Sequence, residues 1–119
     1  MEEEKKISPA GFEYTYTGFE NHVSAQHLKD GETCKIIGIG NSMTPILKSR
    51  QPVIVVPVTE ETELKKNDIV LCKVNGHYYL HKIWSVGGNQ YLIGNNHNHS
   101  NGKITRKNIF GKVLEIIYE

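Results

Sequence analysis

Ser42 and His81 are the residues of this chain whose types and surroundings best suit covalent catalysis. Ser42 follows a Gly-x-Gly-Asn turn in the stretch GIGNSMTPIL, residues 38–47. A serine hydroxyl becomes a nucleophile only when a base removes its proton, and it needs backbone N–H groups aimed at the developing oxyanion. The glycines permit an unusual backbone path, and a helical turn beginning at Ser42 would leave N–H groups unpaired there. The same stretch also fits an ordinary turn with a helix cap, which is the commoner case.

The downstream stretch YYLHKIWSV, residues 78–86, offers a base for Ser42. Successive side chains on a strand point to opposite faces, so only one of His81 and Lys82 can face the serine. A neutral imidazole accepts a proton near pH 7 without special help. A lysine amine does so only when burial lowers its pKa. His81 is therefore the expected base, although a half-buried strand histidine with one hydrogen bond explains the same residue.

The elements that must position these two residues are short strands. Six segments favour Val, Ile and Tyr and are bounded by turn residues, which is typical of a β domain. They are residues 33–39, 53–58, 68–74, 77–86, 90–94 and 109–118. Asn75-Gly76 predicts a hairpin turn, and Gly87–Asn89 and Asn101-Gly102 predict two more. The expected fold class is mainly β, coiled or barrel-like and largely antiparallel.

Residues 1–32 differ from the rest of the chain, because they are polar and show scattered aromatic residues without a sustained period. We expect an N-terminal arm here, with room for flexibility and one short strand around Phe12–Thr17. A β domain is expected over residues 33–119. Helical signals are weak, and we expect only short turns of helix at Ser42 and over Glu60–Lys65.

The composition argues against several classes of protein. The 119 residues correspond to one domain, and 14 Lys and Arg against 13 Asp and Glu give a net charge of +1. A nucleic-acid-binding domain usually carries a basic excess, so no nucleic-acid partner is expected. No apolar run approaches a membrane span and MEEEKK is not a signal peptide, so we expect a cytoplasmic protein without a membrane anchor. Cys34 and Cys72 lie in apolar runs and are expected to be reduced and buried.

The histidines of NNHNHSNG, residues 95–102, do not predict a metal site. His97 and His99 form an i, i+2 pair. A zinc site needs three or four ligands, and no Cys or acidic residue is close in sequence. We therefore expect a polar loop, with no metal and no other cofactor.

The order of these segments resembles the LexA/signal peptidase superfamily of serine peptidases. G-N-S-M-T-P is followed by VIVVPV, LKKNDIVLCKV, YYLHKIWSV, YLIGNN and IFGKVLEII, so the resemblance runs from about Thr33 to the C-terminus. It implies a coiled antiparallel β domain with Ser42 as nucleophile and His81 as base. LexA-type and bacterial signal peptidases have lysine at the base position, whereas histidine there is similar to the endoplasmic-reticulum and archaeal signal peptidases. The implied oxyanion donors are the backbone N–H groups of Asn41 and Ser42.

Three positions depart from the pattern of that superfamily. Its two Gly-Asp pairs appear here as Arg50-Gln51 and Asn67-Asp68, and its Gly-Asp-Asn turn appears as Gly94–Asn96. Asn95 in this turn and Lys82, which stands where the superfamily has a partner arginine, are the candidate orienting residues. An amide at Asn95 can hydrogen-bond an imidazole, but it has no charge to stabilise the imidazolium that forms during the reaction.

The sequence therefore predicts a small soluble serine endopeptidase that acts on a protein or peptide substrate. LexA-type members cleave their own N-terminal segment, often at a small residue before glycine, and Ala10-Gly11 is such a bond. The alternative is a catalytically degenerate relative that binds a protein or peptide strand in the former active-site cleft. No helix-turn-helix precedes the arm, so a DNA-binding repressor is not predicted, and a homodimer is compatible with the sequence.

Overall fold

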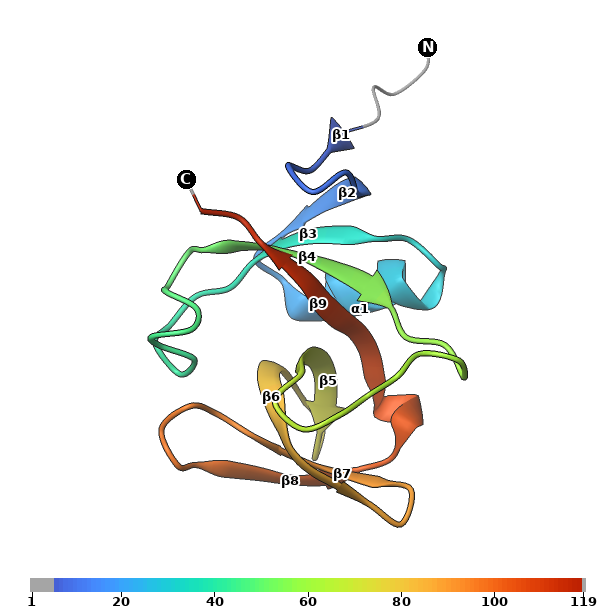
Figure 1. Cartoon of the computed structure of the whole chain (residues 1–119), viewed down its shortest axis with the longest axis vertical. Coiled ribbons are helices and arrows are strands. Elements are labelled where there is room, and N and C mark those ends of the chain that lie inside the picture. The colour runs from blue at the N-terminus through green and yellow to red at the C-terminus, as the bar shows by residue number, and fades with distance from the viewer. Residues whose placement is uncertain (1–5, 119) are drawn as a thin grey trace.

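The computed structural model describes residues 6–118, which form a mainly β fold (Figure 1). The elements are β1 (Lys6–Ile7), β2 (Glu13–Gly18), α1 (Asn21–Lys29), β3 (Cys34–Ile37), β4 (Pro52–Pro57), β5 (Ile69–Val74), β6 (His77–Gly87), β7 (Gln90–Gly94), β8 (Ser100–Ile104), the 3₁₀ turn η1 (Arg106–Asn108) and β9 (Ile109–Ile116). The predicted fold class is confirmed. Within residues 6–118, no helix is long and apolar enough to span a bilayer.

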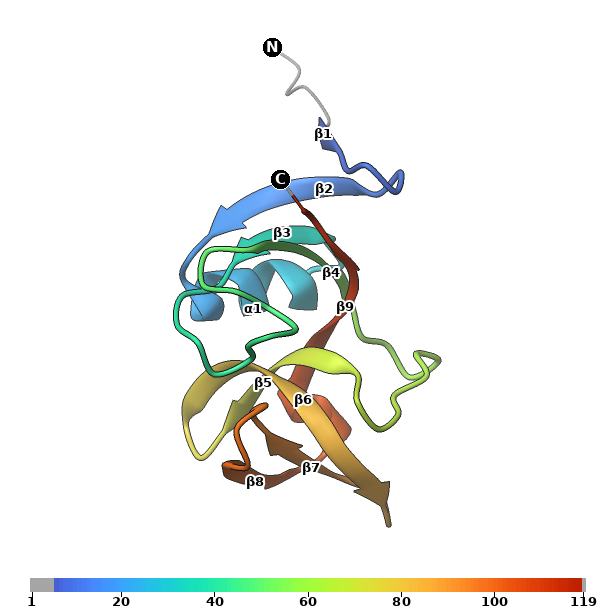
Figure 2. The same cartoon turned by 60° about the vertical axis from the view of Figure 1, so that its left-hand side comes forward.

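One coiled sheet contains the nine strands of the described residues, in the order β1-β2-β3-β4-β9-β5-β6-β7-β8. β2 pairs with β3 in parallel, and the other pairs are antiparallel. β9 lies at the centre, with β4 on one edge and β5 on the other. Figures 1 and 2 show the result: β1–β4 lie in one half, β5–β8 lie in the other, and β9 connects the two halves.

Two apolar clusters fill the two halves, and β5 contributes to both. Leu71 belongs to the cluster under α1, β3 and β4, whereas Val70 and Cys72 belong to the cluster enclosed by β5–β9. This division follows from the alternation of side chains along a strand that is buried on both faces. Cys34 and Cys72 are free and buried, as predicted, with one thiol in each cluster.

α1 is an element that the sequence analysis did not predict. Its residues show only a weak apolar period, yet Ala25 and Leu28 are almost fully buried against the sheet. Gly111 of β9 makes this close packing possible, because a Cβ atom at Gly111 would lie 2.8 Å from a Leu28 methyl group. The expectation of an arm with only one short strand is therefore wrong for residues 21–29. Residues 1–5 of the predicted arm lie outside the described residues.

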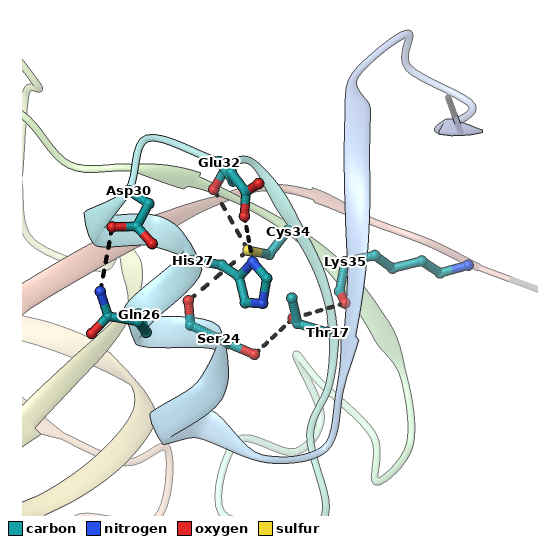
Figure 3. Close-up of polar contacts among 8 residues, drawn as sticks. All are labelled: Thr17, Ser24, Gln26, His27, Asp30, Glu32, Cys34 and Lys35. Carbon is teal, nitrogen blue, oxygen red and sulfur yellow. Dashed lines mark hydrogen bonds and ion pairs between the residues drawn. The ribbon is translucent and has the colours of Figure 1, made fainter. Parts of the chain in front are cut away.

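Polar contacts also fasten α1 to β2 and β3 (Figure 3). The Ser24 hydroxyl donates to Thr17 Oγ1 over 2.7 Å, and the Thr17 hydroxyl donates to the Lys35 carbonyl over 3.4 Å. His27 Nδ1 contacts the Glu32 carboxylate just beyond the helix C-terminus. The predicted division of the chain into an arm over residues 1–32 and a β domain over residues 33–119 stays a prediction.

Two of the three predicted turns lie where the sequence placed them. Asn75 and Gly76, with φ angles of 49° and 83°, connect β5 to β6. Residues 88–89 connect β6 to β7. The prediction for Asn101-Gly102 is wrong, because both residues lie within β8, where Gly102 pairs with Ile93 of β7. The chain reverses earlier, over residues 95–99.

Candidate active site

Ser42 lies in the loop that connects β3 to β4, which we call the serine loop (residues 38–51). The Thr44 N–H donates to the Asn41 carbonyl over 3.2 Å, and the Leu47 N–H donates to the Met43 carbonyl over 2.9 Å. These bonds form consecutive turns at the place where a short turn of helix was expected to begin. Met43 and Leu47 are 4% and 6% exposed, so their burial in the apolar cluster fixes the loop to the body of the protein.

His81 of β6 lies directly opposite Ser42. The Oγ atom of Ser42 is 3.0 Å from Nε2 of His81. The imidazole is 8% exposed, and it stacks on the Tyr79 ring with 5.0 Å between ring centroids and an interplanar angle of 24°. Tyr79 and His81 share a face of β6, as side-chain alternation requires.

Asn101 of β8 orients the imidazole from its other side. Nδ1 of His81 is 2.7 Å from the carboxamide oxygen of Asn101. Because this oxygen only accepts, Nδ1 carries the hydrogen and the Nε2 lone pair faces the Ser42 hydroxyl. Burial lowers the pKa of His81 below its ordinary value; the Asn101 hydrogen bond opposes that effect, and nearby His99 adds to it. The neutral imidazole that a general base requires is therefore the favoured form at pH 7.

The prediction that Asn95 orients His81 is wrong. The Asn95 carboxamide oxygen accepts the backbone N–H groups of His97 and His99, over 2.8 and 3.0 Å. It therefore closes the loop of residues 95–99. This tight loop lets β8 return beside β7 and carry Asn101 to the imidazole. The orienting residue was missed because residues 100–104, SNGKI, have no apolar alternation to indicate a strand.

Lys82 acts on the serine loop through Asn96. Its Nζ atom donates to the Asn96 carboxamide oxygen over 2.7 Å. The Asn96 side chain in turn donates to the Thr44 carbonyl, and the Asn96 backbone N–H donates to the Ser42 carbonyl, each over 2.8 Å. Lys82 is thus placed to orient the loop that carries Ser42, while His81 lies on the other face of β6.

His97 joins the same two loops. Its Nε2 atom lies 3.0 Å from the Asn41 carbonyl and 2.9 Å from Thr44 Oγ1. His97 and Asn96 together contact the backbone on both sides of Ser42.

Among the described residues, no group of three or more His, Cys, Asp or Glu side chains is arranged to hold a metal ion.

One of the two predicted oxyanion donors borders a cleft, because Ser42 lines it and Asn41 does not. Within residues 6–118, no backbone acceptor takes the N–H groups of Asn41 and Ser42. The cleft has a volume of about 430 Å³, and it is lined by Ser42 and His81 together with apolar side chains such as Met43 and Leu80. A polar reacting group could therefore meet the hydroxyl, the imidazole and the unpaired N–H group of Ser42 at one place.

One wall of this cleft is an unpaired strand edge. β6 pairs with β5 from His77 to Lys82, but β7 covers its other edge only from Lys82 onward. Ile83 exchanges hydrogen bonds with residues 67 and 68 on the β5 side. Because bonding direction alternates along a strand, the backbone groups of Tyr78 and Leu80 point away from β5, toward the uncovered edge. An extended peptide could pair there.

A family model described as Peptidase S24-like matches residues 11–114. The chain belongs to the peptidase S24-like family. The match confirms the resemblance to the LexA/signal peptidase superfamily, and it extends that resemblance to β2 and α1. None of the curated proteins compared with the chain matches it.

Proposed function

We propose that this S24-like protein is a serine endopeptidase in which Ser42 is the nucleophile and His81 the general base. The observation that carries the proposal is the 3.0 Å contact between Ser42 Oγ and His81 Nε2, on an imidazole that Asn101 holds in the base-competent tautomer. A hydroxyl, an oriented base and an unpaired amide donor in one cleft are the requirements of acyl transfer.

The chemistry follows the usual course for a serine nucleophile. Ser42 Oγ attacks the peptide carbonyl carbon while His81 Nε2 takes the hydroxyl proton. The N–H groups of Asn41 and Ser42 stabilise the oxyanion. His81 then gives its proton to the leaving amine as the C–N bond breaks, which leaves an ester on Ser42. Water attacks this ester, His81 takes the water proton, and Ser42 Oγ regains a proton as the acid product leaves.

The substrate is an extended polypeptide segment. The free backbone groups of Tyr78 and Leu80 supply one edge for strand pairing, which gives affinity independently of sequence. Ile39 in the serine loop, 69% exposed, is an apolar contact on the other side of the cleft. Protein substrates of several sequences could therefore enter.

Cleavage of the protein's own arm at Ala10-Gly11 stays a prediction. The Ala10 N–H donates to the Glu115 carboxylate over 3.0 Å, in the turn that precedes β2. Phe19, which follows β2, lines the cleft. A six-residue strand spans about 20 Å, so the Ala10-Gly11 bond lies at the opposite end of β2 from Ser42. Cleavage within one molecule therefore requires β1 and β2 to detach, whereas cleavage between molecules requires detachment in the substrate copy alone.

A peptide-binding protein without activity is the second candidate. The observation that favours it is the neutral Asn101 beside His81, where a carboxylate would stabilise the imidazolium of the reaction. In this case the unpaired β6 edge binds a peptide strand that is not cut.

The test is incubation of the purified protein with a peptide library, with new termini identified by mass spectrometry, beside Ser42→Ala, His81→Ala and Ser85→Ala. Ser85 is an exposed serine on the same strand as His81, and it controls for loss of a hydroxyl. We expect cleavage by the parent and Ser85→Ala, and a loss of at least about a thousandfold in the other two.

Cleavage that persists in Ser42→Ala would disprove the proposal. Binding of peptides without cleavage by the parent would favour the second candidate. The mass of the protein itself, followed over days at several protein concentrations, tests the arm: loss of residues 1–10 that speeds up with concentration indicates cleavage between molecules.

A further inference from the structure

A second hollow lies between β6, the loop of residues 95–99 and residues 66–67. Its volume is about 400 Å³, and it is lined by two lysines, one tryptophan and four asparagines. The members used below are Lys66, Lys82, Trp84 and Asn96, and we call the hollow the lysine–asparagine pocket. The serine peptidase chemistry proposed above makes no use of its open space.

The pocket is positively charged and lacks a compensating acid. None of the residues that line it is acidic. Asp68, the nearest acid in sequence to Lys66, forms an ion pair with Lys112 over 3.3 Å. Among the described residues, neither Lys66 nor Lys82 has a carboxylate within ion-pair distance, and the Nζ atom of Lys82 has the neutral Asn96 oxygen as its acceptor. The pocket is therefore suited to an anion.

Trp84 gives the pocket a fixed wall. Its ring packs on Gly94, where a Cβ atom would lie 2.1 Å from the ring. Its indole N–H donates to the Asn95 carbonyl over 3.0 Å. With the nitrogen engaged and one face covered, the ring is held in place as an apolar surface beside the two ammonium groups.

The pocket continues the line of the cleft along β6. Leu80 lines the cleft, whereas Lys82 and Trp84 on the same face line the pocket. Alternate residues of a strand are about 7 Å apart, so the two sites are about two peptide units from each other along β6. Asn96 stands between them, and its backbone N–H holds the Ser42 carbonyl.

We propose that the lysine–asparagine pocket binds a carboxylate of the substrate on the side of the scissile bond that leaves as the amine. This inference rests on the proposed peptidase function, and it assigns the acyl side of the substrate to the cleft and the amine side to the pocket. An Asp or Glu side chain would form charge-assisted hydrogen bonds with Lys66 and Lys82, while its methylene groups contact Trp84. The substrate class is thus a peptide with an acidic residue shortly after the cleaved bond.

Trp84 is the one tryptophan of the sequence, so its indole N–H signal in NMR spectra reports directly on the pocket. The probes are Gly-Gly-Glu-Glu amide, which mimics the leaving product, and Gly-Gly-Gln-Gln amide, which differs only in charge. We expect the glutamate peptide to shift this signal saturably and to bind about tenfold more tightly than the glutamine peptide. The affinity should fall as salt is added.

Two lysine variants distinguish binding in the pocket from electrostatic attraction to the protein surface as a whole. Lys66→Gln should weaken binding of the glutamate peptide about fivefold or more. Lys103→Gln removes the same charge from β8 outside the pocket, and it should change the affinity by less than about twofold. Equal affinity for the two peptides, equal losses in the two variants, or an indole signal that never shifts would overturn the inference.

The titration needs no turnover, so it fails or succeeds independently of the peptidase proposal. A shift of the indole signal in a protein that cuts nothing leaves the pocket established and removes the peptidase. Cleavage of library peptides without preference for a following acid, together with a flat titration, leaves the peptidase and removes the pocket.

Discussion

At the scale of single residues, the group beside His81 Nδ1 decides how strong a base the site contains. Asn101 fixes the tautomer through a 2.7 Å hydrogen bond, but its amide is neutral. Burial of the imidazole lowers its pKa, and the Asn101 hydrogen bond opposes this effect only in part. His81 is thus well oriented and readily neutral, yet it gains little stabilisation once it has taken the proton of Ser42. The arrangement is that of a Ser-His-Asp triad in which a neutral asparagine replaces the charged aspartate.

We predict that Asn101→Asp increases peptidase activity and moves its acid limit. A carboxylate beside Nδ1 favours the imidazolium and raises the pKa of His81. The rate above that pKa should rise about tenfold or more. Because the base works only when neutral, activity in the parent should persist below the ordinary imidazole pKa of 6.5, and in Asn101→Asp it should be lost at a higher pH. The measurement is kcat/KM against pH.

The control for this variant is Asn89→Asp, which adds the same charge in the exposed turn between β6 and β7. Its pH profile should match that of the parent. A profile for Asn101→Asp that also matches the parent would show that Asn101 does not orient the base during catalysis.

At the scale of elements, incomplete pairing and close packing create the site. β7 leaves the first half of β6 uncovered, which produces the edge beside Ser42. The loop of residues 95–99 contacts the serine loop through Asn96 and His97, so neither loop holds its position alone. α1 supports the opposite side of the serine loop, because Leu28, Met43 and Leu47 share one apolar cluster.

Gly111→Ala should destabilise the protein by separating α1 from β9. A Cβ atom there would lie 2.4 Å from a Val55 methyl group and 2.8 Å from a Leu28 methyl group. Such overpacking costs about 1–3 kcal/mol, which thermal unfolding would report as a Tm lower by several degrees. Gly87→Ala is the matched control, since nothing lies within 4 Å of its added Cβ. Equal Tm values for the two variants would contradict this packing.

At the scale of the whole molecule, the two halves behave as one body if β5 and β9 hold them together. β5 places Leu71 in one apolar cluster and Cys72 in the other. β9 pairs with β4 in the first half and with β5 in the second. Because these central strands belong to both cores, opening one half exposes apolar surface of the other, and unfolding should be cooperative.

The two thiols test this cooperativity, because Cys34 reports on one cluster and Cys72 on the other. Burial raises their pKa values to about 11 and about 12. Both thiols should therefore resist iodoacetamide at pH 8 in the native protein and react only through opened forms. We expect equal labelling rates at the two sites, measured by mass spectrometry, with the denatured protein as reference. Markedly faster labelling of one cysteine would show that its half opens separately.

The sequence by itself determined the short strands of the β domain and the identity of the contacting pair, Ser42 and His81. Apolar runs with β-branched residues and an Asn-Gly turn carry local signals, so β3–β7 and β9 were predicted close to their observed bounds. Ser42 and His81 could be selected because the order of the segments around them resembles that of the LexA/signal peptidase superfamily. The prediction that His81 and Tyr79 lie on the same face of their strand follows from side-chain alternation alone.

Only the tertiary structure decided the partners of those residues. α1 could not be predicted because the packing that stabilises it involves Gly111 and its neighbours, which are far away in sequence. β8 could not be predicted because its residues are polar. As a result Asn95 was expected to orient the imidazole, whereas the return of β8 beside β7 brings the amide of Asn101 there. Local sequence encodes the propensity of each segment, whereas contacts between distant segments depend on how the coiled sheet closes, and the site is built from such contacts.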